Sequence, residues 1–255
     1  MRLQNQNILV TGGAQGIGQG IALRLAQEGA DIALNVRVRD ERAESTRRRI
    51  EALGRRCAVV PADVAVVAQG RAAVTAAVEQ LGRLAALVNN AGNEVAAGFL
   101  DVAEADYDRV MSVNLKGAFF LAQAFAAHCR AADHGGRIVN ISSVHEELPF
   151  PNFTAYCMSK GGMKMMMRNL AIELAPLGIT VNNVAPGAIE TPINTRLLTD
   201  PALLDPLLAN IPLRRLGRPA DVAGVVVFLL SADADYVTGT TTVVDGGLLW
   251  NYQEQ

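Results

Sequence analysis

Two side chains with acid–base chemistry stand four residues apart in the segment Tyr156-Cys157-Met158-Ser159-Lys160. In a helix, residues at this spacing lie on one face, so the phenol and the ammonium would share a site. A free tyrosine has a pKa near ~10 and is a poor base at neutral pH. A neighbouring ammonium favours the phenolate, so we expect Lys160 to lower the pKa of Tyr156, which then acts as general base or acid. The alternative is an ordinary surface pair on a helix.

A second group of residues is typical of phosphate binding. The strand-like run Ile8–Thr11 leads into Gly12-Gly13-Ala14-Gln15-Gly16-Ile17-Gly18 and then into a helical stretch. Glycines permit a tight turn close to a pyrophosphate, and the N-terminus of a helix supplies N–H groups and positive potential. The position between strand and helix favours a dinucleotide site over a glycine turn without a ligand. The residues assigned to the cofactor here are Gly12, Gln15, Gly16, Ile17 and Gly18.

Short runs rich in valine and isoleucine alternate with helix-length stretches. Continuous apolarity is typical of strands buried on both faces, as in parallel sheets. The stretches Gly16–Glu28 and Thr154–Ala175 are expected helices, and the first carries an apolar stripe at helical spacing. The alternation predicts a single α/β domain of Rossmann type, a doubly wound parallel sheet of about seven strands with helices on both faces. The expected strands are Ile8–Thr11, Ile32–Val36, Ala58–Val60, Leu87–Asn90, Ile138–Ile141, Thr180–Val184 and Thr241–Val244.

Composition limits the function classes. Half of the 255 residues are hydrophobic and the formal net charge is −2, which argues against nucleic-acid binding through overall charge. The three cysteines show no CxxC spacing, and no cluster of histidine, cysteine and carboxylate has metal-ligand spacing, so we expect no metal. No apolar run reaches ~18 residues and the N-terminus lacks signal-peptide character. We therefore expect a soluble protein of the cytoplasm that spans no membrane.

The passage from Gly187 to about Pro219 is the longest without a regular pattern. It carries Pro192, Pro201, Pro206 and Pro212 around apolar segments. Passages of this length inside a domain are usually lids or binding loops. Because it follows the end of a strand, we expect residues 188–218 to form a substrate lid rather than a surface excursion without a role.

The glycine spacing TGxxxGxG, followed by YxxxK, resembles the short-chain dehydrogenase/reductase family over nearly the whole chain. This resemblance implies an NAD(P)-dependent oxidoreductase in which Tyr156 and Lys160 are catalytic and also contact the cofactor. Ser143, thirteen residues before Tyr156 and after the strand Arg137–Ser142, resembles the catalytic serine. Asn114 matches a helix asparagine that holds a water beside the lysine; a buried amide serving its neighbours is the alternative.

The resemblance also implies further cofactor contacts at the carboxyl ends of strands, where open α/β sheets bind ligands. Asp63 and Val64 resemble the adenine-ring contact, and the segment Asn89-Asn90-Ala91-Gly92 resembles the adenine side of the cleft. Taken singly, Asp63 could be a helix cap and Asn89 a turn residue. The segment that would hold the nicotinamide carboxamide comprises Pro186, Gly187, Ile189 and Thr191.

Cofactor choice depends on the segment Asn35-Val36-Arg37-Val38-Arg39. NAD-specific sites usually have a carboxylate at the end of this strand to accept from the ribose 2′-hydroxyl, and Val36 stands there instead. Arg37 or Arg39 could pair with a 2′-phosphate. We expect NADP as the cofactor, with NAD also accepted; the alternative is that both arginines face solvent.

The segments Asn140–Glu146 and Pro186–Asn194 resemble the glucose 1-dehydrogenase branch of the family. This resemblance implies oxidation of an aldose such as β-D-glucose at C1. Glu94, Ser143, His145 and Asn194 could bind its hydroxyls, although His145 could equally be a loop histidine without a ligand. Asn93 and Val95 depart from the branch.

Two other functions stay open. The first is a 3-oxoacyl or general ketone reductase that uses NADPH. The second is a non-catalytic cofactor-binding sensor, which the presence of the serine, tyrosine and lysine disfavours.

The family resemblance further implies a homotetramer. The same resemblance places the helices Thr154–Ala175 and Ala103–Ala127 at an interface. The methionines of the first helix lie at several helical angles and cannot all face one core, so some could pack against another subunit; the alternative is that they fill the core. The tail with Trp250 and Tyr252 could pack near another subunit.

Overall fold

The computed structural model describes residues 1–192 and 200–251. Within these residues, seven strands form one parallel sheet in the order β3-β2-β1-β4-β5-β6-β7. This confirms the expected doubly wound sheet, and every expected strand is found within two residues of its predicted bounds. The strands are β1 (Asn7–Thr11), β2 (Asp31–Val36), β3 (Cys57–Pro61), β4 (Ala86–Asn89), β5 (Gly136–Ile141), β6 (Ile179–Pro186) and β7 (Thr241–Val244).

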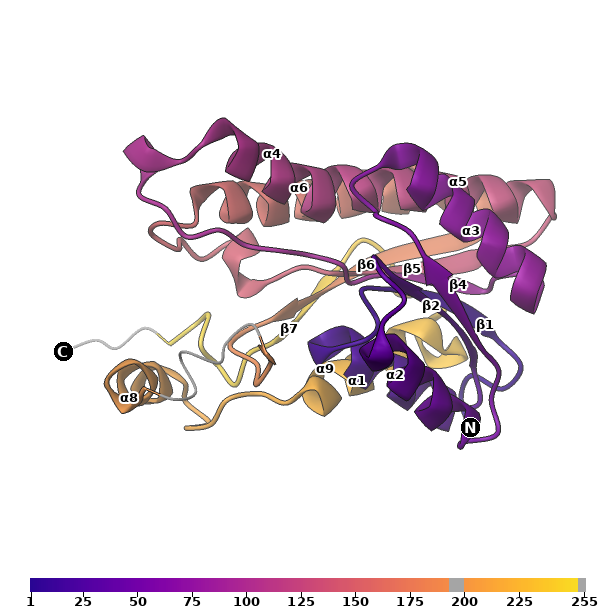
Figure 1. Ribbon diagram of the computed structural model, residues 1–255, viewed down its shortest axis with the longest axis horizontal. Helices are drawn as coiled ribbons and strands as arrows, with labels where there is room; N and C mark the ends of the chain where they lie inside the picture. The colour runs from indigo at the N-terminus through magenta and orange to yellow at the C-terminus, as the bar shows by residue number, and fades with distance from the viewer. Residues whose placement is uncertain (193–199, 252–255) are drawn as a thin grey trace.

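Helices cover both faces of the sheet (Figure 1). On one face α1 (Gly16–Gln27) packs against α9 (Pro219–Leu230), with α2 (Glu41–Glu51) beside them. The apolar stripe of α1 is buried there, with Ile21 and Leu25 fully inaccessible. On the other face lie α3 (Val67–Leu81), α4 (Glu104–Met111), the π-helical segment η2 (Ser112–Gly117), α5 (Ala118–Ala131) and α6 (Thr154–Glu173). Each face buries its own apolar cluster.

The strand order reverses direction between β1 and β4. The chain first builds outward from β1 to β2 and β3, then crosses back to place β4 on the other side of β1. The connections that leave β1 and β4 therefore run to opposite faces of the sheet. A crevice opens between them at the carboxyl ends of the strands, where such sheets bind ligands.

The expectation of an irregular passage between Gly187 and Pro219 was wrong for residues 201–210, which form the helix α8 (Pro201–Asn210). Pro201 occupies the first turn, where a missing N–H costs nothing, and Asp200 caps the helix by accepting from the Ala202 N–H at 3.0 Å. Prolines were therefore misleading as helix breakers here. The lid itself stays a prediction, since residues 193–199 of it lie outside the described residues.

The continuous helical stretch Glu104–Ala131 is long and apolar enough to cross a membrane by length and composition alone, with a mean hydropathy of 1.3. It is the one such helix among the described residues. Its apolar window is 44% buried within the protein, and the stretch packs on α3 and α6. Core helices pass the same test, so this is weak evidence for a membrane span. The cytoplasmic location stays a prediction.

Candidate active site

A cleft of about 1260 Å³ opens at the carboxyl ends of the strands. Its walls come from the turn after β1, from the segments that follow β2, β3 and β4, and from the loops after β5 and β6. Pockets for single small molecules usually measure about 300–1,000 Å³. This cleft is therefore large enough for a dinucleotide together with a small substrate.

The glycine-rich turn after β1 has the conformation that phosphate binding needs. Gly12 and Gly16 adopt positive φ angles of 62° and 53°, and a Cβ atom at Gly18 would lie 2.3 Å from the Gly12 carbonyl oxygen. Within the described chain, the first turn of α1 holds no acidic residue, and Gln15 supplies no side-chain cap. The N–H groups that begin α1 are thus free of side-chain acceptors and suited to an anion.

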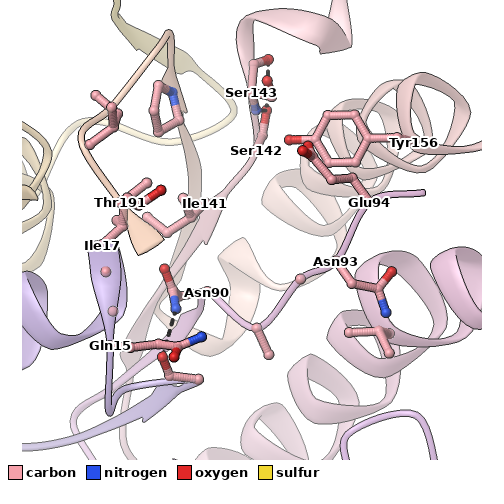
Figure 2. Close-up of a pocket in the computed structure, with 18 of the residues that line it drawn as sticks. Gln15, Ile17, Asn90, Asn93, Glu94, Ile141, Ser142, Ser143, Tyr156 and Thr191 are labelled. Atoms are coloured by element: carbon pink, nitrogen blue, oxygen red, sulfur yellow. Dashed lines mark hydrogen bonds between the residues drawn. The ribbon is translucent and has the colours of Figure 1, made fainter. Parts of the chain in front are cut away.

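The turn is held by the end of β4. The side-chain Nδ2 of Asn90 donates to the backbone carbonyls of Thr11 and Gly12 at 2.9 and 3.2 Å. The Thr11 hydroxyl accepts from the N–H groups of Asn90 and Ala91, each at 2.9 Å. Figure 2 shows Asn90 beside the turn that carries Gln15 and Ile17. Asn89, in contrast, is no turn residue, because it lies buried in β4.

The remaining expected cofactor residues also line the cleft. Asp63 stays partly tied to its own turn, since its Oδ1 accepts from the Ala65 N–H at 2.9 Å. Thr191 lies against the glycine-rich turn, 3.5 Å from where a Cβ at Gly16 would stand. The set that reaches the cleft comprises Val64, Asn90, Ala91, Gly92, Pro186, Gly187 and Ile189. Shape, glycine geometry and free helix N–H groups together fit a dinucleotide.

The structure separates the two arginines expected at the ribose. Arg37 lines the cleft, whereas Arg39 pairs with Glu44 of α2 and is not among the described lining residues. Sequence analysis missed Arg42, which does line the cleft and donates to Gln15 Oε1 at 2.9 Å. Arg42 lies in the first turn of α2 and contacts the glycine-rich turn, which is distant in sequence. No local sequence pattern could have predicted this contact.

Tyr156, Lys160 and Ser143 come together at the other end of the cleft. The Lys160 ammonium lies 5.6 Å from the centre of the Tyr156 ring and donates to the carbonyl of Ile141 at 2.9 Å. Ser143 lies near enough to the Tyr156 phenol to act on its pKa, and the Ser143 hydroxyl accepts from the His145 N–H at 3.2 Å. Tyr156 therefore lies by the serine that follows β5, and Lys160 binds the last residue of β5, which ends at Ile141 rather than at Ser142.

The expected lowering of the Tyr156 pKa is contradicted. Burial raises the pKa of Tyr156 to about 12, the hydrogen bond from Ser143 acts to lower it, and the charge of Glu94 acts to raise it. Burial also lowers the pKa of Lys160 to about 8, against the carboxylates of Glu146 and Glu94. The sequence rule failed because it weighed the neighbouring ammonium and omitted the cost of placing both charges in a site that little water reaches.

Asn114 is fully buried in η2, a π-helical segment of the kind often found at functional sites. Its side chain donates to the Asn93 carbonyl at 2.9 Å and to the Ser159 hydroxyl at 3.0 Å, and accepts from the Asn93 N–H at 2.8 Å. Asn114 therefore ties the loop after β4 to α6, one residue before Lys160. Its expected role beside a water stays a prediction.

Two of the expected substrate residues border the reacting side chains. Glu94 lies beside Tyr156 (Figure 2), and burial raises the pKa of its carboxyl. The His145 ring stacks on Phe150 at 4.3 Å and meets Tyr156 edge-on at 6.2 Å, and burial lowers its pKa. Asn194, expected as a further substrate residue, lies outside the described residues, as does Tyr252 of the tail.

Among residues 1–192 and 200–251, no group of three or more histidine, cysteine or carboxylate side chains could hold a metal ion.

The family model described as enoyl-(acyl carrier protein) reductase matches residues 12–249. The L-rhamnose 1-dehydrogenase (NAD(P)(+)) of Sphingomonas sp. is 41% identical over 98% of this chain and 99% of its own. The chain belongs to the short-chain dehydrogenase/reductase family. The 3beta-hydroxysteroid dehydrogenase 1 of Eggerthella lenta is also 41% identical, with 96% and 94% covered, and the glucose 1-dehydrogenase of Gluconobacter oxydans is 36% identical, with 97% and 93% covered.

The solved structures agree with this membership. The gluconate 5-dehydrogenase of Burkholderia cenocepacia, in complex with NADP and tartrate, has a TM-score of 0.91 and is 39% identical, with 97% of this chain and 96% of that one covered. The protein is thus an oxidoreductase of this family that acts on CH–OH groups and uses a nicotinamide dinucleotide, NAD or NADP. The steroid dehydrogenase and the rhamnose dehydrogenase are equally identical to this chain, so sequence identity alone does not select the substrate.

The lowered pKa of Lys160 predicts how stability depends on pH. The folded value is about 8 against 10.5 for the free side chain. Between these values the unfolded chain binds more protons than the folded one, so the free energy of unfolding rises with pH in this window, by at most about 3 kcal/mol. We expect Lys160→Met to lack this rise. Urea titrations of both proteins from about pH 7 to pH 10 measure the difference, and parallel curves would contradict the assignment.

Proposed function

We propose that the protein oxidises an aldose at C1, with β-D-glucose as the leading substrate and NADP as the preferred cofactor. The observation that carries the proposal is the meeting of Glu94 and His145 with the Ser143–Tyr156 pair in one cleft. The C1 hydride goes to C4 of the nicotinamide and the hydroxyl proton goes to Tyr156, so that aldose and NADP⁺ give lactone, NADPH and a proton.

Each reacting side chain has one task in this proposal. Ser143 hydrogen-bonds the substrate oxygen, while its bond to Tyr156 favours the phenolate. Tyr156 takes the hydroxyl proton in oxidation and returns it in reduction. Lys160 holds a positive charge 5.6 Å from the centre of the Tyr156 ring and contacts the cofactor. Because burial raises the pKa of Tyr156, the neighbouring positive charge of Lys160 is needed to bring the phenolate within reach near neutral pH.

His145 offers a defined hydrogen-bonding atom to a sugar. Its Nδ1 lies 3.0 Å from the Leu148 carbonyl, which can only accept, so Nδ1 carries the proton. Because burial lowers its pKa, the ring is neutral and Nε2 is an acceptor. A hydroxyl group can donate to it, and a second hydroxyl can donate to Glu94. Paired acceptors of this kind suit a polyol better than a hydrocarbon substrate.

Support for NADP comes from the charges around the expected ribose position. Strand β2 ends at the apolar Val36, and Arg37 and Arg42 line the cleft beside it. Asp40 is the carboxylate nearest in sequence, but its Oδ1 caps α2 at Ala43 and its Oδ2 pairs with Arg42. Arg42 thus shares its charge with Asp40, and Arg37 is the main partner that this corner offers to a 2′-phosphate, with Arg42 beside it.

A reductase for 3-oxoacyl compounds or other ketones, using NADPH, is the second candidate. It is favoured by Leu203 and Leu207 of α8 and by Leu248, which give the cleft an apolar wall. An acyl chain could lie along these leucines. The same chemistry at Tyr156 would then run in the reducing direction.

We also propose a homotetramer. Exposed apolar side chains gather on α6 and α5, where Ile172, Met165, Met158 and Phe119 are 77%, 56%, 49% and 43% exposed. Trp250 of the tail is 74% exposed. Surfaces of this kind usually mark an interface.

Removal of the phenol tests the reaction. Tyr156→Phe should lower kcat by about 10²- to 10⁴-fold because the proton acceptor is lost, while KM for NADP stays unchanged. The absorbance at 340 nm measures NADP reduction with D-glucose, L-rhamnose and D-gluconate, and NADPH oxidation with ketones. Tyr107→Phe, on α4 outside the described cleft lining, is the matched control. Turnover retained in Tyr156→Phe would refute the mechanism, and activity with ketones alone would select the second candidate.

Cofactor preference is tested at the two arginines. We expect Arg37→Ala and Arg42→Ala each to lower the ratio of kcat/KM for NADP to that for NAD by about tenfold or more, since each removes a charged partner of the phosphate. Arg39→Ala, whose side chain pairs with Glu44, should leave the ratio unchanged. A ratio that falls only in Arg39→Ala would exclude this arrangement.

The oligomer is tested by light scattering on the eluting protein. We expect about four times the chain mass of 27.0 kDa, and dissociation in Ile172→Asp because a buried charge disrupts an apolar interface. A monomer at micromolar concentration would contradict the tetramer.

A further inference from the structure

Glu146 is a buried carboxylate that the reaction proposed above does not use. It ends the short 3-10 helix η3 (Val144–Glu146), and its side chain is 2% exposed. It is not among the described residues that line the cleft. A buried carboxylate is costly unless it is paired or hydrogen-bonded, so its partners show what it does.

One partner is the end of a ladder of asparagines across three strands. Asn89, Asn140 and Asn183 stand in register on β4, β5 and β6. Asn89 donates to Asn140 at 2.9 Å, Asn140 donates to Asn183 at 3.0 Å, and Asn183 donates to Glu146 Oε2 at 3.2 Å. A carboxylate can only accept, so it fixes the direction of every amide in the ladder. All three amide dipoles point their N–H groups toward its charge.

The other partner is Ser142, next to the catalytic candidate. The Ser142 hydroxyl donates its one proton to Glu146 Oε2 and accepts from the Ser143 N–H at 2.5 Å. Because Glu146 takes the proton, the oxygen of Ser142 must turn its lone pairs toward the Ser143 backbone. Glu146 thereby holds the backbone from which the Ser143 hydroxyl reaches Tyr156.

Glu146 also faces the cations of α6. Lys164 lies 3.8 Å from Glu146 Oε1, which among the described residues has no hydrogen-bond partner. Lys164 also forms an ion pair with the exposed Glu147. Lys160 is nearly inaccessible and donates at 2.9 Å to the carbonyl of Ile141, one residue before the Ser142 that binds Glu146. Of the two carboxylates that act on the charge of Lys160, Glu146 acts more strongly than Glu94. Among the described residues, the charged and titratable groups that act on Lys160 or contact it are thus Glu146 on η3, Glu94 after β4 and Tyr156 on α6.

We propose that Glu146 is a positioning residue of the active site, which orients Ser143 through Ser142 and supplies the buried negative charge that balances Lys160. The proposal rests on the assignment of Ser143, Tyr156 and Lys160 as reacting residues. The asparagine ladder stabilises this charge through the hydrogen bond that Asn183 donates to Glu146. The loop after β5 and the helix α6 are in this way linked through one carboxylate.

The first test replaces the charge and keeps the shape. Glu146→Gln should lower kcat about ten- to a hundredfold through misplacement of Ser143, with KM for NADP unchanged. Glu147→Gln, which removes the neighbouring carboxylate that also pairs with Lys164 but does not touch Ser142, should keep the wild-type kcat. Equal kcat in wild type and Glu146→Gln would overturn the orienting role.

The second test needs no substrate. Burial alone lowers the pKa of Lys160 and Glu146 opposes it, so loss of this charge lowers that pKa further. The rise of unfolding free energy with pH should then begin about one pH unit lower in Glu146→Gln than in the wild type. The shift should vanish in a Lys160→Met background, which isolates the coupling between the two side chains. An unshifted rise would overturn the charge-balancing role.

A third variant covers the case in which Glu146→Gln does not fold. Ser142→Ala cuts the link to Ser143 and leaves the carboxylate in place, so it should lower kcat without a shift of the stability profile. An unchanged kcat would overturn the orienting role. If the wild type turns over no substrate at all, the proposed function fails, while the stability profiles still decide whether Glu146 balances Lys160.

Discussion

The burial of the Lys160 ammonium is the constraint on which the active site depends. The side chain is 4% exposed and donates to the carbonyl of Ile141, the last residue of β5. One carbonyl dipole does not balance a full charge, and burial accordingly lowers the pKa to about 8. The carboxylates of Glu94 and Glu146 oppose this effect. A lysine with this pKa is still mostly charged at neutral pH and can support the phenolate of Tyr156.

The parallel sheet makes this arrangement possible because all of its strands end at the same edge. The end of β1 supplies the glycine-rich turn, β4 supplies Asn90, β5 supplies Ser143 and β6 supplies Gly187. In-register pairing then aligns side chains across neighbouring strands, as the asparagines of β4, β5 and β6 show. The sheet that positions the cleft therefore also carries a polar network to its edge, in which the side-chain N–H group of each asparagine donates a hydrogen bond.

Much of the fold followed from local patterns. Apolar runs such as Ile32–Val36 became strands because both of their faces are buried, and the glycine spacing from Gly12 to Gly18 admitted one turn geometry. Local patterns failed where the folded structure selects the partner of a side chain. Arg39 turns to Glu44 whereas Arg42 reaches Gln15 across 27 positions. Pro201, one of the prolines that predicted an irregular passage, instead begins α8, since a cap at Asp200 was available.

The order of residues determined the sheet, the glycine-rich turn and the placement of Tyr156 and Lys160 on one helix face, because periodicity and spacing act within a few residues. Packing decided the rest. Burial reversed the expected change in the pKa of Tyr156, and the asparagines and Glu146 became one network only when strands far apart in sequence paired. Desolvation and hydrogen bonding depend on the surroundings of a group in space, which a linear sequence does not specify.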